Sequence, residues 1–487
     1  MAIENLCYLL SFNPSLSHLK IVAHEIDTPL KIRLLARAIS NLKKLEHLEL
    51  ESVLGADPWR DALPTVFLSF PETLKSLVIR AGNASQDGTL HVTPEETDFD
   101  FQDGPVVLRQ EPLSQLTKLT LVVYNALDLS HYGILQHMPN LVTLEFQFLQ
   151  ELGETNLAAL APAARAHCHA LLNFIVRQPS KHGPDTEMIQ LLAGLNPTLE
   201  TLSYDHFQDE ASLIAPVLQR YCDNLRDIRF RSCRALHGDT IRSILTFCAV
   251  LERFQVLNTD GTPGGSATIE DLVTDEWACT GIRHLELAVF WGEFEENEPY
   301  YLQTPPKQHP PPKDQERWNL LEKLYIQVGA LKELEVLGLQ GGIHVSIEDV
   351  EEADRYDGYE DDMREQAAFP QLFALGNPKT HKRGYLTWLG GLTKLKELRG
   401  SIHMASPEIA ATLGRREVLW MTEHWPCLKV IELLEYAEKI PKRVPDYPHL
   451  NLFMKHLPAI DICRSRPPLP PSRSLKSPYE MDIFTVV

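Results

Sequence analysis

The sequence predicts an α/β solenoid, in which short strands form a curved parallel sheet on the concave side and helices line the convex side. Three observations predict this fold. A short apolar pattern recurs about fourteen times, neighbouring copies mostly stand 25 to 33 residues apart, and each copy combines a strand period with a helix period. Because each unit of a solenoid packs only on its neighbours, 487 residues need not divide into several globular domains.

The recurring pattern is Leu-x-x-Leu-x-Leu, with apolar substitutions. Its first three copies begin at Leu16, Leu45 and Leu74, so each step is 29 residues. One such copy arises by chance in many helices, whereas a long series at similar steps indicates a structural repeat. The later copies begin at Leu116, Leu141, Leu171, Leu199, Leu225, Leu251, Ile282, Leu334, Leu395, Leu428 and, more weakly, Leu457.

Each copy predicts one strand followed by one helix. The apolar residues of x-x-Leu-x-Leu alternate, so they share one face of a strand. The rest of a unit has helical spacing, as in residues 240–248, where Ile241, Ile244, Leu245 and Cys248 recur on one face. A strand and a helix within about 20–29 residues are typical of leucine-rich repeats. The alternative, a helical solenoid of armadillo or HEAT type, is opposed by the strand alternation and by the short period.

Cysteines mark the predicted corners between helix and strand. Cys168, Cys222, Cys248 and Cys279 each stand three residues before the first apolar anchor of a unit. A small and mildly apolar side chain suits a tight buried corner. The eight cysteines include no CxxC pair, and the first residues lack the features of a signal peptide. We therefore expect reduced thiols and a cytoplasmic or nuclear protein.

These cysteine positions, clearest through residues 195–290, resemble the cysteine-containing subclass of leucine-rich repeats. The segments 275–287 and 417–428 are similar to a family of fungal F-box/leucine-rich-repeat proteins. The resemblance implies a substrate-receptor subunit of an SCF-type ubiquitin ligase. No F-box is recognisable here, because the first repeat already begins at Leu16, so a Skp-type adaptor is expected as a partner only if an F-box precedes Met1. The alternative is a stand-alone inhibitor or scaffold unconnected to ubiquitination.

Three acidic insertions interrupt the predicted solenoid of residues 1–463. They lie near residues 82–112, 292–315 and 340–385. Insertions in solenoids leave as loops on one face, often the binding face. Two interpretations stay open: solvated loops, or acidic arms that contact a basic partner.

Residues 464–487 form a tail rich in proline and arginine, which we expect to be largely disordered. Its Arg464-x-x-Pro467-x-x-Pro470 pattern is typical of a polyproline ligand, although such matches are common by chance.

Composition and motifs argue against catalytic activity and against binding to nucleic acid. A net charge of −20 disfavours binding to phosphate backbones or to anionic membranes. The segment Gly261–Gly265 lacks the lysine of a phosphate loop and is better explained as a turn. The run His167-Cys168-His169 has metal-ligand residue types, but adjacent side chains point in different directions. We expect no enzyme activity, no cofactor, no metal, and neither nucleic acid nor membrane as a partner.

The predicted concave face carries a candidate binding patch. Side chains between the apolar positions project from this face and align with those of neighbouring units about 5 Å away. Arg177, Arg229, Arg231 and Arg253 are thereby placed on neighbouring or near-neighbouring strands. Because arginine forks bind carboxylate and phosphate oxygens, we expect a protein partner with an acidic or phosphorylated peptide. The alternative is that these arginines pair with acidic residues of the same face, namely Asp205, Asp227 and Glu286.

Overall fold

The computed structural model divides the chain into two compact units, Met1–His206 and Phe207–Leu475, which are described separately. No helix that the structure describes combines the length and the apolarity needed to cross a bilayer. The structure describes residues 3–23, 29–52, 67–80, 111–123, 135–148, 160–177, 185–206, 211–233, 236–258, 264–265, 267–290, 312–341, 375–376, 384–403, 414–434 and 455–463.

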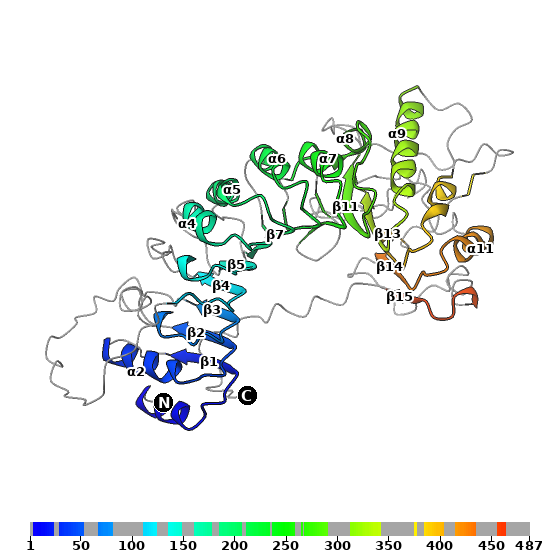
Figure 1. Ribbon diagram of the computed structural model, residues 1–487. Coiled ribbons are helices and arrows are strands. Elements are labelled where there is room, and N and C mark those ends of the chain that lie inside the picture. The colour runs from blue at the N-terminus through cyan, green and yellow to red at the C-terminus, as the bar shows by residue number, and fades with distance from the viewer. Residues whose placement is uncertain are drawn as a thin grey trace, which may run out of the picture. The chain divides into compact units, whose positions relative to one another are not determined.

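The first unit is a parallel sheet whose strands follow one another in sequence order, with helices on one side of it (Figure 1). Its described strands are β1 (His18–Ala23), β2 (His47–Ser52), β3 (Ser76–Arg80), β4 (Lys118–Val123), β5 (Thr143–Phe148), β6 (Asn173–Arg177) and β7 (Thr201–Asp205). Its described helices are α1 (Ile3–Ser11), α2 (Pro29–Ser40), α4 (Leu160–His167) and α5 (Asp185–Gly194).

The second unit repeats this plan, with β11 following β9 in the sheet and the short β10 pairing with β11. Its described strands are β8 (Asp227–Arg231), β9 (Arg253–Leu257), β10 (Ala267–Thr268), β11 (His284–Phe290), β12 (Val336–Gly341), β13 (Glu397–His403), β14 (Val430–Leu434) and β15 (Asp461–Cys463). The helical elements are α6 (Ala211–Gln219), α7 (Gly238–Phe247), α8 (Ile269–Val273), α9 (Pro312–Gly329), the 3-10 helix η4 (Leu386–Gly391) and α11 (Arg415–His424).

The register of the strands aligns the apolar anchors predicted from the sequence. In each repeat of the first unit, the first apolar residue within the strand pairs with its equivalent in a neighbouring strand and is buried. These residues are Leu19, Leu48, Leu77, Leu119, Leu144, Phe174 and Leu202. In the second unit the corresponding series is Ile228, Phe254, Leu285, Leu337, Leu398 and Ile431. This parallel arrangement of one strand per repeat confirms the predicted α/β leucine-rich-repeat solenoid.

The helices supply the other half of the core, as their apolar spacing predicts. In α7, Ile241, Ile244 and Leu245 are buried, and Cys248 caps the helix with no exposed surface. Cys168, Cys222 and Cys279 are also buried where the chain passes toward a strand, so the predicted role of cysteine at these corners is confirmed.

The starts of most described strands share one recurring hydrogen-bond pattern. A single carbonyl accepts two consecutive N–H groups from the next repeat, as the Arg226 carbonyl does from Glu252 and Arg253, at 2.8 Å each. The Glu252 carbonyl accepts the same pair of bonds from Arg283 and His284, at 2.8 and 3.1 Å. Because this pattern involves only the backbone, it sets the register whatever polar side chains the strands carry.

The glycine-rich segment between β9 and β10 enters the sheet. The N–H of Gly264 donates to the Val256 carbonyl, and the N–H of Ala288 donates to the Gly264 carbonyl, both at 2.7 Å. Gly265 has a φ of 102°, a left-handed conformation that favours glycine. Gly264 therefore connects β9 to β11, and residues 261–263 of the predicted turn lie outside the described residues.

The predicted insertions lie mostly outside the described residues. Of segment 82–112 the structure describes residues 111–112, and of segment 292–315 it describes residues 312–315, which begin helix α9. Segment 340–385 overlaps the end of β12 and the residues just before η4. The tail 464–487 is not among the described residues, so its predicted disorder and ligand motif stay predictions.

Candidate functional site

Polar side chains of the second unit gather on the strand face opposite the helices, which we call the polar face. The two apolar residues of β8 are buried, while Asp227, Arg229 and Arg231 alternate with them on the other side. The register places Asp227 beside Arg253 and Arg229 beside Gln255. Neighbouring parallel strands are about 4.8 Å apart, so these side chains lie within contact distance.

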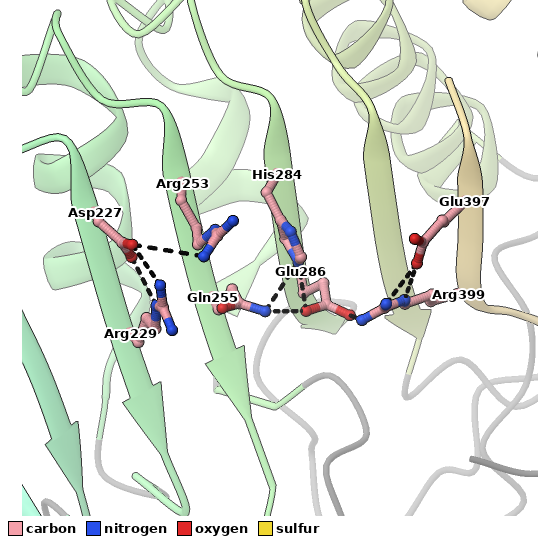
Figure 2. A network of polar contacts seen from close by, with 8 residues as sticks. All are labelled: Asp227, Arg229, Arg253, Gln255, His284, Glu286, Glu397 and Arg399. Carbon is pink, nitrogen blue, oxygen red and sulfur yellow. Dashed lines mark hydrogen bonds and ion pairs between the residues drawn. The ribbon is translucent and has the colours of Figure 1, made fainter. Parts of the chain in front are cut away.

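Asp227 is shared by two arginines (Figure 2). Arg229 donates from Nε and Nη2 to the two carboxylate oxygens, at 2.9 and 2.6 Å, and Arg253 Nη1 lies 3.6 Å from Oδ2. The hydrogen bond to Asp227 raises the pKa of Arg229 and outweighs the opposite effect of burial. The Asp227 side chain is 21% exposed, whereas those of Arg229 and Arg253 are 45% and 40% exposed. The carboxylate therefore holds two guanidinium groups that remain open to solvent.

A second polar cluster is centred on Glu286, whose side chain has no exposed surface. His284 Nε2 lies 2.8 Å from Glu286 Oε2, and Gln255 donates to the same oxygen. On the other side, Arg399 Nη1 donates to Oε1 at 3.2 Å (Figure 2). A fully buried carboxylate needs such partners, because an unpaired charge is costly to remove from water.

Arg399 joins this cluster from β13, two strands away from β11 in the sheet. Its Nε donates to Glu397 Oε2 at 2.9 Å. Burial would lower the pKa of Arg399, but the charges of Glu286 and Glu397 and the hydrogen bonds to them raise it overall. The intervening strand β12 contributes Gly338, where an added Cβ would lie 2.7 Å from Glu286 Cγ. A glycine therefore leaves the space through which Glu286 and Arg399 meet.

A similar buried carboxylate, Glu145, lies in the first unit. Arg177 Nε and Gln147 Nε2 both donate to Glu145 Oε1 at 2.8 Å, and Lys118 Nζ lies 3.4 Å from Oε2. Burial raises the pKa of Glu145, but the bonds from Arg177 and Gln147 and the charges of Arg177 and Lys118 outweigh it, so the pKa is lowered.

The predicted patch is partly assembled. Arg229, Arg231 and Arg253 lie together on β8 and β9 of the second unit, while Arg177 belongs to β6 of the first unit. The alternative interpretation is also partly observed, because Arg229 and Arg253 pair with Asp227. No ion pair joins Arg231 to another residue that the structure describes, and binding by the patch stays a prediction.

Sequence reasoning missed two contributors to the site, Glu397 and Arg399. The apolar anchors predict the repeat that begins at Leu395, but they do not indicate which polar side chains this repeat contributes. Arg399 directly follows the anchor Leu398, just as Arg229 follows Ile228. Aligning the polar positions of every repeat would have found it.

The described residues hold no group of three or more His, Cys, Asp or Glu side chains that could bind a metal ion. In the run His167-Cys168-His169, the Cys168 side chain is buried. Burial raises the pKa of this thiol to about 11. His424, in the last turn of α11, stacks on Trp420 with 4.1 Å between ring centroids.

No protein-family pattern and no curated protein matches the chain. Among solved structures, it is similar to a chain described as "Crystal structure of Rad7 and Elc1 complex in yeast". The identity is 10%, the TM-score is 0.36, and the match covers 95% of this chain and 88% of that chain.

Proposed function

We propose that the protein is a non-catalytic recognition scaffold that binds an acidic or phosphorylated segment of a protein partner on its polar face. The observation that carries this proposal is the arginine group of β8 and β9. The guanidinium groups of Arg229 and Arg253 both contact the carboxylate of Asp227, and Arg231 follows on the same face of β8. The group therefore has a surplus of positive charge within a chain whose net charge is −20.

The geometry of the group suits an anion. Arg229 uses Nε and Nη2 on Asp227, and Arg253 approaches the same carboxylate with Nη1 only. The remaining N–H donors are available to an incoming carboxylate or phosphate, which guanidinium groups bind in a forked geometry. Because Asp227 already restrains two of the arginines, less side-chain entropy is lost when a ligand binds.

A charge-reversal experiment tests the proposal. Arrays of peptides with phosphoserine, glutamate or serine at the same positions would be screened for binding to the full chain. We expect acidic and phosphorylated peptides to bind, with affinity falling as salt rises. Replacing Arg229, Arg231 and Arg253 by glutamate is expected to weaken that binding about tenfold or more.

The matched control reverses three exposed arginines outside the polar face of the same unit, Arg220, Arg415 and Arg416. Both variants change the net charge equally, so a general electrostatic effect would weaken binding in both. Equal binding by the polar-face variant and the wild type would overturn the proposal.

The finer assignment, a substrate receptor of an SCF-type ubiquitin ligase, is supported by the resemblance of the repeats to fungal F-box/leucine-rich-repeat proteins. Such a receptor is expected to co-purify with a Skp-type adaptor and a cullin. If the full-length protein bound acidic peptides but neither of these subunits, it would instead be a stand-alone inhibitor or scaffold.

A further inference from the structure

Two buried cysteines of adjacent repeats contact one another through their sulfur atoms. Cys222 Sγ and Cys248 Sγ are 2.7 Å apart, which is closer than unbonded sulfur atoms normally pack. The two residues are 6% and 0% exposed. Neither residue is in a disulfide in this structure.

The repeat places the two sulfur atoms together. Each cysteine stands five residues before a strand, Cys222 before Asp227 of β8 and Cys248 before Arg253 of β9. Equivalent positions of adjacent strands are about 4.8 Å apart, and disulfides typically join residues whose Cα atoms are about 4.4–6.8 Å apart. The solenoid therefore brings a pair of thiols into bonding range at a helix-to-strand corner.

The environment differentiates these two thiols from the other corner cysteines. The hydrogen bond from Cys248 lowers the pKa of Cys222, while the same contact and burial raise the pKa of Cys248. Burial alone raises the pKa of Cys168 to about 11 and dominates in raising that of Cys279 to about 12. Because the thiolate is the reactive form, these directions favour Cys222 as the attacking thiol of the pair.

We propose that Cys222 and Cys248 are an intramolecular disulfide site, which closes when the protein is oxidised by a peroxide. The Cys222 thiolate attacks hydrogen peroxide, breaks the O–O bond and becomes a sulfenic acid, and the released hydroxide takes up a proton to form water. The Cys248 sulfur then attacks the Cys222 sulfur, and the S–O bond breaks. A second water molecule leaves with the thiol proton, so the two thiols lose two electrons to the peroxide.

The disulfide would connect the two repeats that carry the arginine group. It would join the corners directly before β8 and β9, and so would restrain the spacing between Arg229 and Arg253. The site does not depend on the proposed binding function, since it is defined by the two sulfur atoms alone.

Peptide mapping of the oxidised full-length protein tests the site. The protein would be treated with hydrogen peroxide, free thiols would be blocked by an alkylating reagent under denaturing conditions, and the chain would be cut by trypsin without reduction. Arginines separate the cysteines, so Cys222 lies in fragment 221–226 and Cys248 in fragment 243–253. We expect these two fragments to be covalently linked, and to separate again after reduction.

Two variants make the assignment specific. Cys222→Ser is expected to abolish the linked fragment and leave Cys248 open to alkylation, whereas Cys279→Ser, at the same repeat position, is expected to retain the link. Oxidation of the exposed Cys427 is the control that shows that the oxidant has acted. The proposal would be overturned if Cys427 were oxidised while Cys222 and Cys248 were both alkylated, or if Cys248 were linked to Cys279 instead.

Discussion

At the scale of single residues, the polar face depends on small spaces as much as on charges. Glu286 is fully buried although it is ionisable, and it reaches Arg399 only because β12 offers Gly338 between them. A side chain at that position would occupy the space of the Glu286 methylene groups. The glycine is thus required by a contact and not by its own backbone conformation.

Gly338→Ala is therefore expected to destabilise the second unit by about 1–3 kcal/mol, because the added Cβ would displace Glu286 from Arg399. Urea unfolding of the full chain measures this change. Gly281→Ala is the control, since no atom lies within 4 Å of its added Cβ, and it is expected to alter stability by less than about 0.5 kcal/mol. Equal effects of the two substitutions would contradict the steric explanation.

The buried carboxylate of Glu145 predicts that the stability of the folded protein depends on pH. Its pKa in the folded protein is lowered, chiefly by bonds from Arg177 and Gln147 that outweigh burial. Its contribution to stability is then fully present above the unfolded value of about 4.3, and is lost as the pH falls through the lower folded value. Glu145→Gln should cost about 1–3 kcal/mol at pH 7, and this cost should shrink as the pH falls below about 4.3 and through the lower folded pKa. A cost independent of pH in urea unfolding would exclude a role for the ionised carboxylate.

At the scale of elements, short helices depend on local hydrogen bonds at their ends. Helix α8 has only five residues, and a helix of that length is unstable by itself. Its first turn is closed by a capping box, in which Thr268 Oγ1 accepts from the Asp271 N–H at 3.1 Å and Asp271 Oδ2 accepts from the Thr268 N–H at 3.0 Å. The strand β10 can therefore turn directly into the helix.

Thr268→Ala is expected to cost about 1 kcal/mol, because it removes one bond of this box and leaves a helix N–H without its acceptor. Thr274→Ala, at the C-cap of the same helix, removes only an exposed bond to the Glu270 carbonyl and is expected to have little effect. Thermal unfolding of both variants compares them. A larger loss for Thr274→Ala would show that the capping box does not stabilise α8.

At the scale of the whole molecule, a solenoid is stabilised mainly by contacts between neighbouring repeats. Each described strand pairs with its neighbours in the same unit, and each unit has its own series of buried anchors. A defect in one repeat should therefore open that repeat and its neighbours before it affects distant ones.

Phe146→Ala in β5 and Phe254→Ala in β9 test this locality, because both side chains are fully buried. Each substitution is expected to remove about 3–5 kcal/mol of local stability. Hydrogen exchange followed by mass spectrometry should show lost protection around β4 to β6 for Phe146→Ala, and around β8, β9 and β11 for Phe254→Ala. Uniform loss of protection in both units would contradict local unfolding.

The apolar pattern alone predicts the repeats, the alternation of strand and helix, and which face of each strand is buried. These are local properties, since the period of the apolar residues sets the element, and the recurrence of the pattern stacks equivalent anchors such as Leu285 and Leu337. The sequence also placed Arg229, Arg231 and Arg253 on one face for the same reason.

The partner that each polar side chain contacts emerges only when the repeats are stacked in the folded chain. Glu286 and Arg399 are 113 residues apart and meet across a glycine, with two predicted insertions between them in the chain. Asp227 attracts two arginines, and Cys222 meets Cys248 from the next repeat. Such contacts depend on register, side-chain length and free space between strands, and no local pattern encodes these.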